Sequence, residues 1–184
     1  MKETLIYESK KSKIFFCEDT EWGKPVVMKV SNYEFATPKD LSQFYNEYEV
    51  INQVKLGCIR NVLKKGRENN RHYLMMEWIE GENLSVAFRG KQNDIVDFLY
   101  LAIAMAEALS QIHNSNVIHK DISPFNVIVN LQERAVHIID FGISTSLDLK
   151  QHYLGNPERL EGTLAYSSPE QTGRMNRFLD YRTG

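Results

Sequence analysis

Two short stretches of the chain decide its fold: residues 119–126 read HKDISPFN, and residues 140–142 read DFG. Between them lie two short runs of mainly apolar, β-branched residues, 127–129 and 136–139, separated by a polar segment. Runs of this kind, bounded by turn-forming residues, predict two short strands joined by a hairpin. The octet therefore ends where one strand begins, and the tripeptide begins where the next strand ends.

The polar residues of the two stretches share a chemistry. Asp121 has the position of a base that faces a substrate hydroxyl, while Asn126 and Asp140 offer oxygen ligands of the kind that Mg²⁺ prefers. Phosphoryl transfer depends mainly on positioning and on neutralising charge, and these groups supply both. A DFG tripeptide alone is a weak signal. The octet, a spacer of strand length and the tripeptide together are a strong one.

A lysine and a glutamate nearer the N-terminus extend this pattern. The run VVMKV predicts a strand in which Lys29 shares a face with Val27. In the helix that follows, Glu47 comes three residues after Phe44 and four before Ile51, which puts it on the apolar face. A carboxylate on a buried face needs a partner, and Lys29 is the obvious candidate. Taken alone, an exposed lysine and a glutamate at the rim are an equal alternative.

The first part of the chain is rich in predicted strands. Besides the run that carries Lys29, short β-rich runs occur at residues 4–7, 14–17 and 73–78. One helix lies among them, and its start is marked by Thr37, a capping residue, followed by a proline. Strands grouped around a single helix predict a small β-rich lobe.

Beyond a turn-rich junction at residues 80–83, the chain becomes mainly helical. Residues 94–113 carry one continuous apolar face, which predicts a long helix. Residues 144–162 show no sustained period and are predicted to form a long loop. We therefore expect an α+β fold of two lobes, residues 1–79 and residues 80–184.

Composition and charge narrow the possible partners. The formal net charge of -2 gives no electrostatic reason to expect nucleic acid or an anionic membrane surface. The longest apolar stretch, residues 98–106, is too short to span a bilayer, and the N-terminus lacks the apolar segment of a secretory signal. Cys17 and Cys58 lie far apart without metal-ligand spacing and are interpreted as reduced residues. We expect a cytoplasmic protein that binds neither nucleic acid nor membrane.

These motifs resemble the signature set of eukaryotic-type protein kinases. The resemblance covers nearly the whole chain and implies that ATP and Mg²⁺ bind between the lobes. It also implies transfer of the γ-phosphate to a hydroxyl of a protein substrate. In that family pattern Asp121 would be the catalytic base, and Asn126 and Asp140 would bind magnesium. Lys29, paired with Glu47, would contact the α- and β-phosphates.

The resemblance further implies an adenine site and a peptide site. The adenine site would use Met76 as gatekeeper, Glu77, Trp78 and Ile79 as hinge, Ile14 and Val27 above the ring, and Ile128 below it. Residues 162–163 and 168–170 would close the activation segment. Thr163, where tyrosine kinases typically carry proline, favours serine or threonine as the phosphate acceptor.

Residues 160–177, LEGTLAYSSPEQTGRMNR, indicate a subtype within the kinase family. They resemble the N-terminal kinase domain of large bacterial sensor proteins, in which an AAA-type ATPase region, a GAF domain and a histidine kinase follow. The last residues, 180–184, read DYRTG where related sequences read DYRTD and enter a buried helix. We therefore expect an incomplete C-lobe, further domains of a larger protein as partners, and no activity of residues 1–184 alone.

Two departures from the family pattern leave a second function open. Tyr7, Ser9 and Ser12 occupy glycine positions of the phosphate-covering loop, where side chains limit close approach of the backbone. Ser123 replaces a lysine that would steady the γ-phosphate, and serine cannot neutralise charge. The alternative is a pseudokinase, a nucleotide-binding regulatory module. A kinase of small molecules is disfavoured by residues 162–170, which shape the peptide site in protein kinases.

Overall fold

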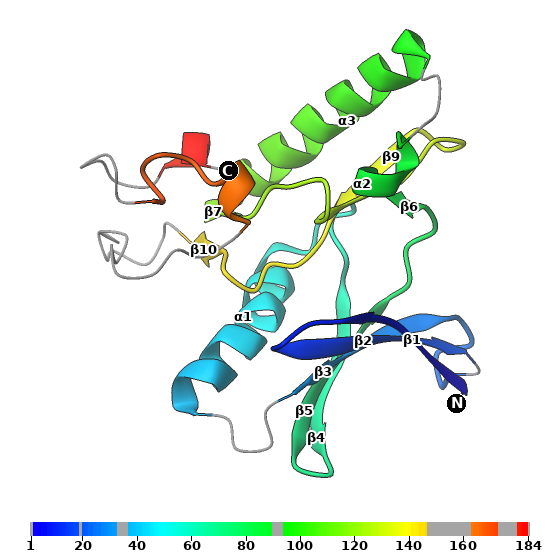
Figure 1. The fold of residues 1–184 in the computed structure, drawn as a ribbon, viewed down its shortest axis with the longest axis vertical. Helices are drawn as coiled ribbons and strands as arrows, with labels where there is room; N and C mark the ends of the chain where they lie inside the picture. Colours follow the sequence, from blue (N-terminus) through cyan, green and yellow to red (C-terminus); the bar gives the residue numbers. More distant parts are fainter. Residues whose placement is uncertain are drawn as a thin grey trace.

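The computed structural model describes residues 2–18, 20–32, 37–89, 94–146, 163–172 and 180–183. Its N-terminal part is a five-stranded sheet with helix α1 beside it, and its C-terminal part carries helix α3 and a smaller sheet (Figure 1). The chain is thus an α+β protein of two lobes, as predicted.

The N-terminal sheet is antiparallel and has the strand order β1-β2-β3-β5-β4. Its strands are β1 (Lys2–Glu8), β2 (Ser12–Glu18), β3 (Val26–Ser31), β4 (Val62–Glu68) and β5 (Arg71–Glu77). Each predicted β-rich run forms a strand. Strand β4 was not predicted, because its sequence VLKKGRE is mostly charged and does not alternate between apolar and polar residues.

The register of the sheet sorts its side chains onto two faces. On β3, Val27 lies opposite Phe16 and Met76, and Lys29 lies opposite Ile14 and Leu74. Residues directly opposite one another in a sheet point to the same face. One face therefore presents Lys29 in an apolar surround, while the other buries Cys17 in a separate cluster.

Helix α1 (Pro38–Val54) packs on the face that carries Lys29. It begins as the sequence predicted: the Thr37 side chain accepts a hydrogen bond from the N–H of Asp40, and the Asp40 side chain accepts one from the N–H of Thr37. This reciprocal capping box satisfies two N–H groups that the first turn leaves without partners. Phe44 and Tyr48 then pack against the buried residues of the sheet.

The C-terminal elements are short except for one helix. They are β6 (Glu82–Asn83), α2 (Leu84–Ala87), α3 (Ile95–Asn114), β7 (Val117–Ile118), β8 (Val127–Asn130), β9 (Ala135–Ile138), β10 (Thr145–Ser146) and two 3-10 turns (Leu164–Tyr166, Tyr181–Thr183). Strands β6, β8 and β9 form one sheet, and β7 pairs with β10. Helix α3, β8 and β9 confirm three predictions. Within the predicted loop, residues 145–146 form β10, and residues 147–162 lie outside the described residues.

One apolar core joins the two parts of the molecule. Val50 and Ile51 of α1 lie in the same buried cluster as Ala108 and Ile112 of α3 and Phe141 of the DFG motif. Helix α1 is therefore held against the segment that carries Asp140 by packing as well as by polar contacts.

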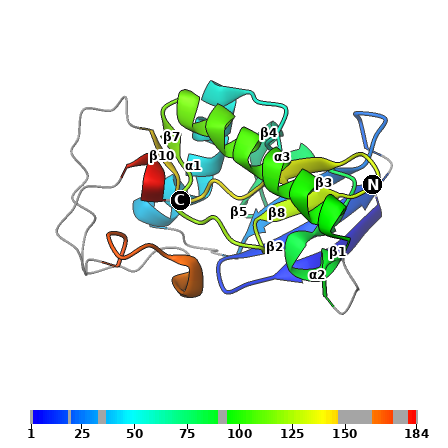
Figure 2. The same cartoon turned by 90° about the horizontal axis from the view of Figure 1, so that it is seen from above.

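Helix α3 lies on the outside of the C-terminal part, as the view from above shows (Figure 2). Leu101, Ala108 and Ile112 are buried, whereas its outer apolar side chains are about half exposed. In the described part of the chain, α3 is the one helix long and apolar enough to cross a membrane. The sequence-based expectation that residues 98–106 are too short to span a bilayer considered only part of this helix. Core helices of soluble proteins pass the same test but are mostly buried, whereas 17% of the apolar window of α3 is buried in the described structure. The buried side of α3 packs on β7, β8 and β9.

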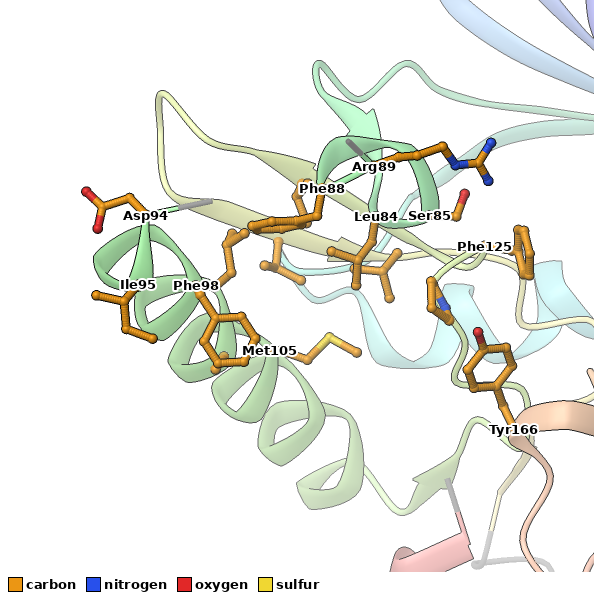
Figure 3. Close-up of a pocket in the computed structure, with 16 residues that line it drawn as sticks. Leu84, Ser85, Phe88, Arg89, Asp94, Ile95, Phe98, Met105, Phe125 and Tyr166 are labelled. Atoms are coloured by element: carbon orange, nitrogen blue, oxygen red, sulfur yellow. The ribbon is translucent and has the colours of Figure 1, made fainter. Parts of the chain in front are cut away.

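An apolar groove of about 850 Å³ lies between α3, α2 and the β8–β9 sheet. Phe98 and Met105 of α3 point into it from one side and Phe88, directly after α2, from the other, with Phe125 and Tyr166 at one end (Figure 3). This apolar groove beside α3 lies outside the charged cluster described next.

Candidate active site

Three charged side chains meet between the two parts of the molecule. The Nζ of Lys29 lies 2.8 Å from Oε2 of Glu47 and 3.0 Å from Oδ1 of Asp140. These residues come from β3, from α1 and from the segment after β9. The side chain of Glu47 is 3% exposed and that of Lys29 13%, whereas that of Asp140 is 47% exposed. The structure thus pairs Lys29 with Glu47, and the alternative of an exposed lysine with a rim glutamate is wrong.

The charges of this cluster support one another. Burial alone would lower the pKa of Lys29, but the carboxylates of Asp140 and Glu47 raise it above its ordinary value. The ammonium of Lys29 is in turn the main reason why the pKa of Asp140 lies below its usual range. Lys29 and Asp140 are therefore both charged at neutral pH, and the exposed side of Asp140 offers a carboxylate to solvent or to a ligand.

Asp121 is held by two hydrogen-bond donors. Its Oδ1 accepts from the backbone N–H of Thr163 (2.7 Å) and its Oδ2 from Nδ2 of Asn126 (2.8 Å). The same Nδ2 also donates to the carbonyl oxygen of Asp121 (2.9 Å), so Oδ1 of Asn126 is left as an acceptor. The carbonyl of Asn126 accepts from the N–H of Ile139 (2.9 Å), which brings Asn126 beside Asp140.

Both motifs contain a backbone conformation that is uncommon for residues other than glycine. Lys120 has φ of 66° and Asp140 has φ of 65°. Such conformations gather at functional sites, where the surrounding structure holds them in place. Asp140 is held by the N–H of Gly142, which donates to its Oδ1 (3.3 Å). A Cβ at position 142 would lie 3.2 Å from that oxygen, so glycine leaves room for this orientation.

His119 contacts both the loop that carries Asp121 and the segment that leads into the DFG motif. Its side chain is fully buried; the N–H of Asp121 donates to Nδ1 (3.2 Å), and Nε2 lies 3.1 Å from the carbonyl oxygen of Ile139. Because Nδ1 accepts, Nε2 carries the proton and donates to Ile139. The ring also meets that of Phe141 edge-on at 4.6 Å. Burial lowers the pKa of His119, so the ring is neutral at neutral pH.

The stability of the fold should decrease as the pH falls below about 6.5, the ordinary pKa of histidine. Burial lowers the pKa of each histidine in the described residues: His72, His113, His119 and His137. The unfolded chain would then bind protons that the folded chain does not, which favours unfolding. Urea unfolding at about pH 7.5 and 5.5 should give a lower midpoint at the lower pH. An equal or higher midpoint at the lower pH would contradict this prediction.

The residues predicted to enclose the adenine from above lie together on the Lys29 face. Val27 and Met76 are buried in one cluster, with Ile14 packed against them. Trp78 meets the ring of Phe16 edge-on at 4.6 Å. Phe16 was not singled out from the sequence, although the period of two puts it on the same face as Ile14.

Glu77, the first of the predicted hinge residues, has polar partners within the protein. Oε1 of Glu77 contacts Nζ of Lys24 at 3.0 Å, and its Oε2 accepts from Nδ2 of Asn61 at 2.9 Å. Burial alone would raise the pKa of Glu77, but these two hydrogen bonds bring it below its ordinary value. Ile79 and Ile128 are both almost fully buried. The N–H of Glu77 also donates, to the carbonyl oxygen of Asn61 at 3.0 Å, so its N–H and both side-chain oxygens already have partners within the protein.

The turn between β1 and β2 closes on itself through Ser9. Its Oγ accepts hydrogen bonds from the N–H groups of Lys11 (3.2 Å) and Ser12 (3.0 Å), and donates to the carbonyl of Ser12 (3.1 Å). Backbone N–H groups of such turns are the donors that hold phosphates in glycine-rich loops. Two of these donors are satisfied here by a side chain, so Ser9 would compete with a phosphate for them.

Ser123 does not stand in for the missing lysine. It is 3% exposed, and its Oγ is buried without a hydrogen-bond partner in the part of the chain that the structure describes. Its carbonyl accepts from the N–H of Asn126 (2.9 Å). The structure therefore gives this predicted catalytic residue a place in the turn of the loop, away from the surface of the cleft.

Gln171 joins the region after Thr163 to the catalytic loop, a contact that was not predicted from the sequence. Its Nε2 donates to the carbonyl of Lys120 (2.6 Å), and its Oε1 accepts from the N–H and Oγ–H of Ser168 (3.0 and 3.2 Å). Lys120 directly precedes Asp121. This contact and the one between Thr163 and Asp121 therefore fix two segments together that are far apart in the sequence.

A two-lobed α+β fold with this charged cluster between its lobes, and an aspartate and asparagine loop beside it, is the arrangement of a protein-kinase domain. The family model for the protein kinase domain matches residues 4–180. The chain therefore belongs to the protein kinase family.

Several of its curated relatives are named as bacterial serine/threonine-protein kinases. A probable serine/threonine-protein kinase of Clostridium perfringens is 30% identical over 160 residues, which cover 86% of this chain and 23% of the relative. The probable serine/threonine-protein kinase PknB of Bifidobacterium longum is 26% identical over 179 residues, 91% of this chain and 26% of the relative. The serine/threonine-protein kinase PrkC of Bacillus subtilis is 23% identical over 161 residues, which cover 86% of this chain and 24% of the relative. The chain spans about a quarter of the length of these relatives.

Proposed function

We propose that this kinase domain, within the full-length protein, transfers the γ-phosphate of ATP to serine or threonine hydroxyls of proteins in bacterial signal transduction. One observation carries the proposal: Lys29 contacts both Glu47 and Asp140, next to an Asp121 that is oriented by Asn126 and Thr163. This arrangement supplies a phosphate-binding cation, two oxygen ligands for a metal and a base. The names of the relatives support serine and threonine as acceptors.

Asp121 is the proposed catalytic base. It would accept the proton of the substrate hydroxyl as the hydroxyl oxygen bonds to the γ-phosphorus and the bond from that phosphorus to the ADP oxygen breaks. The N–H of Thr163 and the amide of Asn126 orient the carboxylate with neutral donors, so its negative charge remains. The contact from Thr163 also couples the base to the segment that would hold the acceptor peptide.

The oxygen atoms beside Asp121 fit Mg²⁺. Oδ1 of Asn126 makes no hydrogen bond within the described residues, and the carboxylate of Asp140 is half exposed. The described residues contain no group of three or more His, Cys, Asp or Glu that could enclose a metal ion. Two protein oxygens suit magnesium, which usually takes its other ligands from water and phosphate. When bound, the ion would neutralise phosphate charge.

The remaining site residues would bind the nucleotide. Lys29 would contact the α- and β-phosphates, with Glu47 keeping its ammonium in place. The adenine would lie below Ile14 and Val27 and above Ile128, with Met76 as gatekeeper and the backbone of Glu77, Trp78 and Ile79 as hinge. The buried apolar face around Lys29 supports this placement.

Mg-ATP should raise the melting temperature of the protein, and Asp140→Asn should abolish the part of this shift that depends on magnesium. A ligand of the folded state at 100 times its Kd adds about 2.7 kcal/mol of stability, which is several degrees for a domain of this size. Thermal unfolding would be followed with ATP, with and without Mg²⁺, for the wild type and for Asp140→Asn. Asp97→Asn, an equal change on α3 away from the cluster, should keep the wild-type shift. Equal shifts with and without magnesium in the wild type would remove Asp140 as a metal ligand.

Two observations favour the pseudokinase as a second candidate. Ser9 occupies two N–H donors of the phosphate-covering turn, and Ser123 buries its hydroxyl where a lysine would steady the γ-phosphate. Both would weaken phosphate binding and leave Asp121 and Asp140 intact. A nucleotide-binding regulatory module would show the magnesium-dependent shift without transferring phosphate, and the Asp121 variant considered below separates the two candidates.

We also propose the setting that the sequence predicted: a cytoplasmic protein with an N-lobe at residues 1–79, a C-lobe at residues 80–184 and further domains of a larger sensor protein. The relatives, about four times as long, are compatible with such domains. The apolar groove beside α3, which is open in the part of the chain that the structure describes, supports packing of further C-lobe segments there. We therefore propose that residues 1–184 alone do not transfer phosphate.

A further inference from the structure

We infer that Asn46 is a positioning residue that holds the metal-binding loop after β9 against helix α1, and so keeps Asp140 placed for Mg-ATP. This inference rests on the proposed function. The sequence had singled out Glu47, the next residue, but gave no role to Asn46.

The side-chain amide of Asn46 reaches into a cluster of carbonyl oxygens. Its Nδ2 donates to the carbonyls of Phe141 (3.0 Å) and Ser144 (2.9 Å), with the carbonyl of Gly142 at 3.3 Å and Oγ of Ser144 at 3.5 Å. An amide nitrogen carries two hydrogens, so the two short contacts use both. The loop is also folded back on itself, because the Oγ of Ser144 donates to the carbonyl of Phe141 (2.6 Å).

Asn46 provides a second polar link between the same two segments. The first link is charged and runs from Glu47 through Lys29 to Asp140. The second is neutral and runs from Asn46 to the residues that follow Asp140. The buried ring of Phe141, which packs in one cluster with Val50 and Ile51 of α1, adds an apolar contact.

The two polar links differ in whether their side chains would also contact the nucleotide or the metal. In the proposed function, Lys29 contacts phosphates and Asp140 contacts magnesium, so the charged link would be loosened when Mg-ATP binds. The Asn46 link uses only carbonyl oxygens, which neither the phosphates nor the metal need. It can therefore keep α1 and the loop together both with and without the nucleotide.

The chemistry at position 46 requires a neutral donor. Asn46→Asp has nearly the same shape but replaces the two N–H donors by an oxygen that faces at least two carbonyl oxygens. The loop carbonyls would lose their partner and meet a negative charge. Asn46→Ala removes the donors without adding charge and should give a weaker form of the same defect.

Asn52→Asp is the matched control. Asn52 also lies on α1 but is exposed, so the same substitution changes the charge of the helix without touching the loop.

The first test is amide hydrogen exchange on the chain of residues 1–184 without nucleotide. For Asn46→Asp, the amides of Gly142 and Ser144 should exchange roughly tenfold faster than in the wild type, as expected when hydrogen bonds that close a loop are lost. Asn52→Asp should exchange as the wild type does. Unchanged exchange in Asn46→Asp and in Asn46→Ala would overturn the inference. If Asn46→Asp fails to fold, Asn46→Ala decides the outcome.

The second test measures kinetics in the full-length natural protein. Misplacement of a catalytic group by about 1 Å can reduce a rate by about 10²-fold, so kcat should fall on that scale in Asn46→Asp. The magnesium concentration that gives half of the maximal rate should rise, while Asn52→Asp should match the wild type. A loss of rate that follows a lower melting temperature, with unchanged half-saturating magnesium, would overturn the positioning role. A wild type without any transfer would contradict the proposed function instead, and the exchange measurement would still decide on Asn46.

Discussion

Asp121→Asn should reduce phosphate transfer by about 10²- to 10⁴-fold in the full-length natural protein, the range that a positioned base contributes. Binding of Mg-ATP should change little, because in the proposed function Asp121 contacts the acceptor hydroxyl and no phosphate. A fall in kcat with an unchanged KM for ATP is the signature of a group that acts only in the chemical step. Transfer of labelled γ-phosphate to protein, together with the ATP-induced melting shift, measures both quantities.

The controls for Asp121→Asn separate the two candidate functions. Asp97→Asn makes the same chemical change on α3, away from the site, and should keep the wild-type rate. The chain of residues 1–184 alone should show no transfer in either form. If the full-length wild type and Asp121→Asn incorporate equal amounts of label, while Mg-ATP still raises the melting temperature of both, the chain is a nucleotide-binding module and not an enzyme.

Much of the site could be predicted because its signals are local in the sequence. The strand period placed Lys29 on the apolar face, and the helical period placed Glu47 inward, so their contact followed from the cost of an unpaired buried carboxylate. The start of α1 followed from Thr37 and the proline after it. Each of these features depends on residues within one or two turns of the chain.

The features that sequence missed depend on contacts between distant segments. The side chains of Asn46 and Gln171 donate to backbone carbonyls that are 95 and 51 positions away in the sequence. An asparagine or glutamine in a sequence does not by itself reveal a partner at such a distance. Ser9 was recognised as a departure from the glycine of the family pattern. Its hydrogen bonds across the turn between β1 and β2 depend on the orientation of its side chain, which the sequence does not specify. Strand β4 was missed because pairing with β5, rather than an alternating pattern, makes it a strand.

Lys29→Met should destabilise the fold by about 3 to 5 kcal/mol, because removing one partner of a buried ion pair leaves the other charge uncompensated. Glu47 is almost completely buried, and Asp140 cannot replace the lost cation. The guanidinium of Arg60 offsets part of the loss. It lies buried nearby, and although burial lowers its pKa, the charges of Glu47 and Asp140 act to raise it. We therefore expect a value near 3 kcal/mol, at the lower end of this range.

The double variant Lys29→Met/Glu47→Leu should recover most of the stability that Lys29→Met loses, since an apolar pair of similar volume often replaces a buried ion pair without loss. Urea unfolding of the wild type, both single variants and the double variant measures the coupling between the two residues. Lys64, on the edge strand β4 of the same sheet, forms an exposed ion pair with Glu21. Lys64→Met breaks this pair and should leave the urea midpoint nearly unchanged. A Lys29→Met protein as stable as Lys64→Met, with no coupling in the double variant, would show that the charge of Lys29 serves the ligand alone and contributes nothing to the fold.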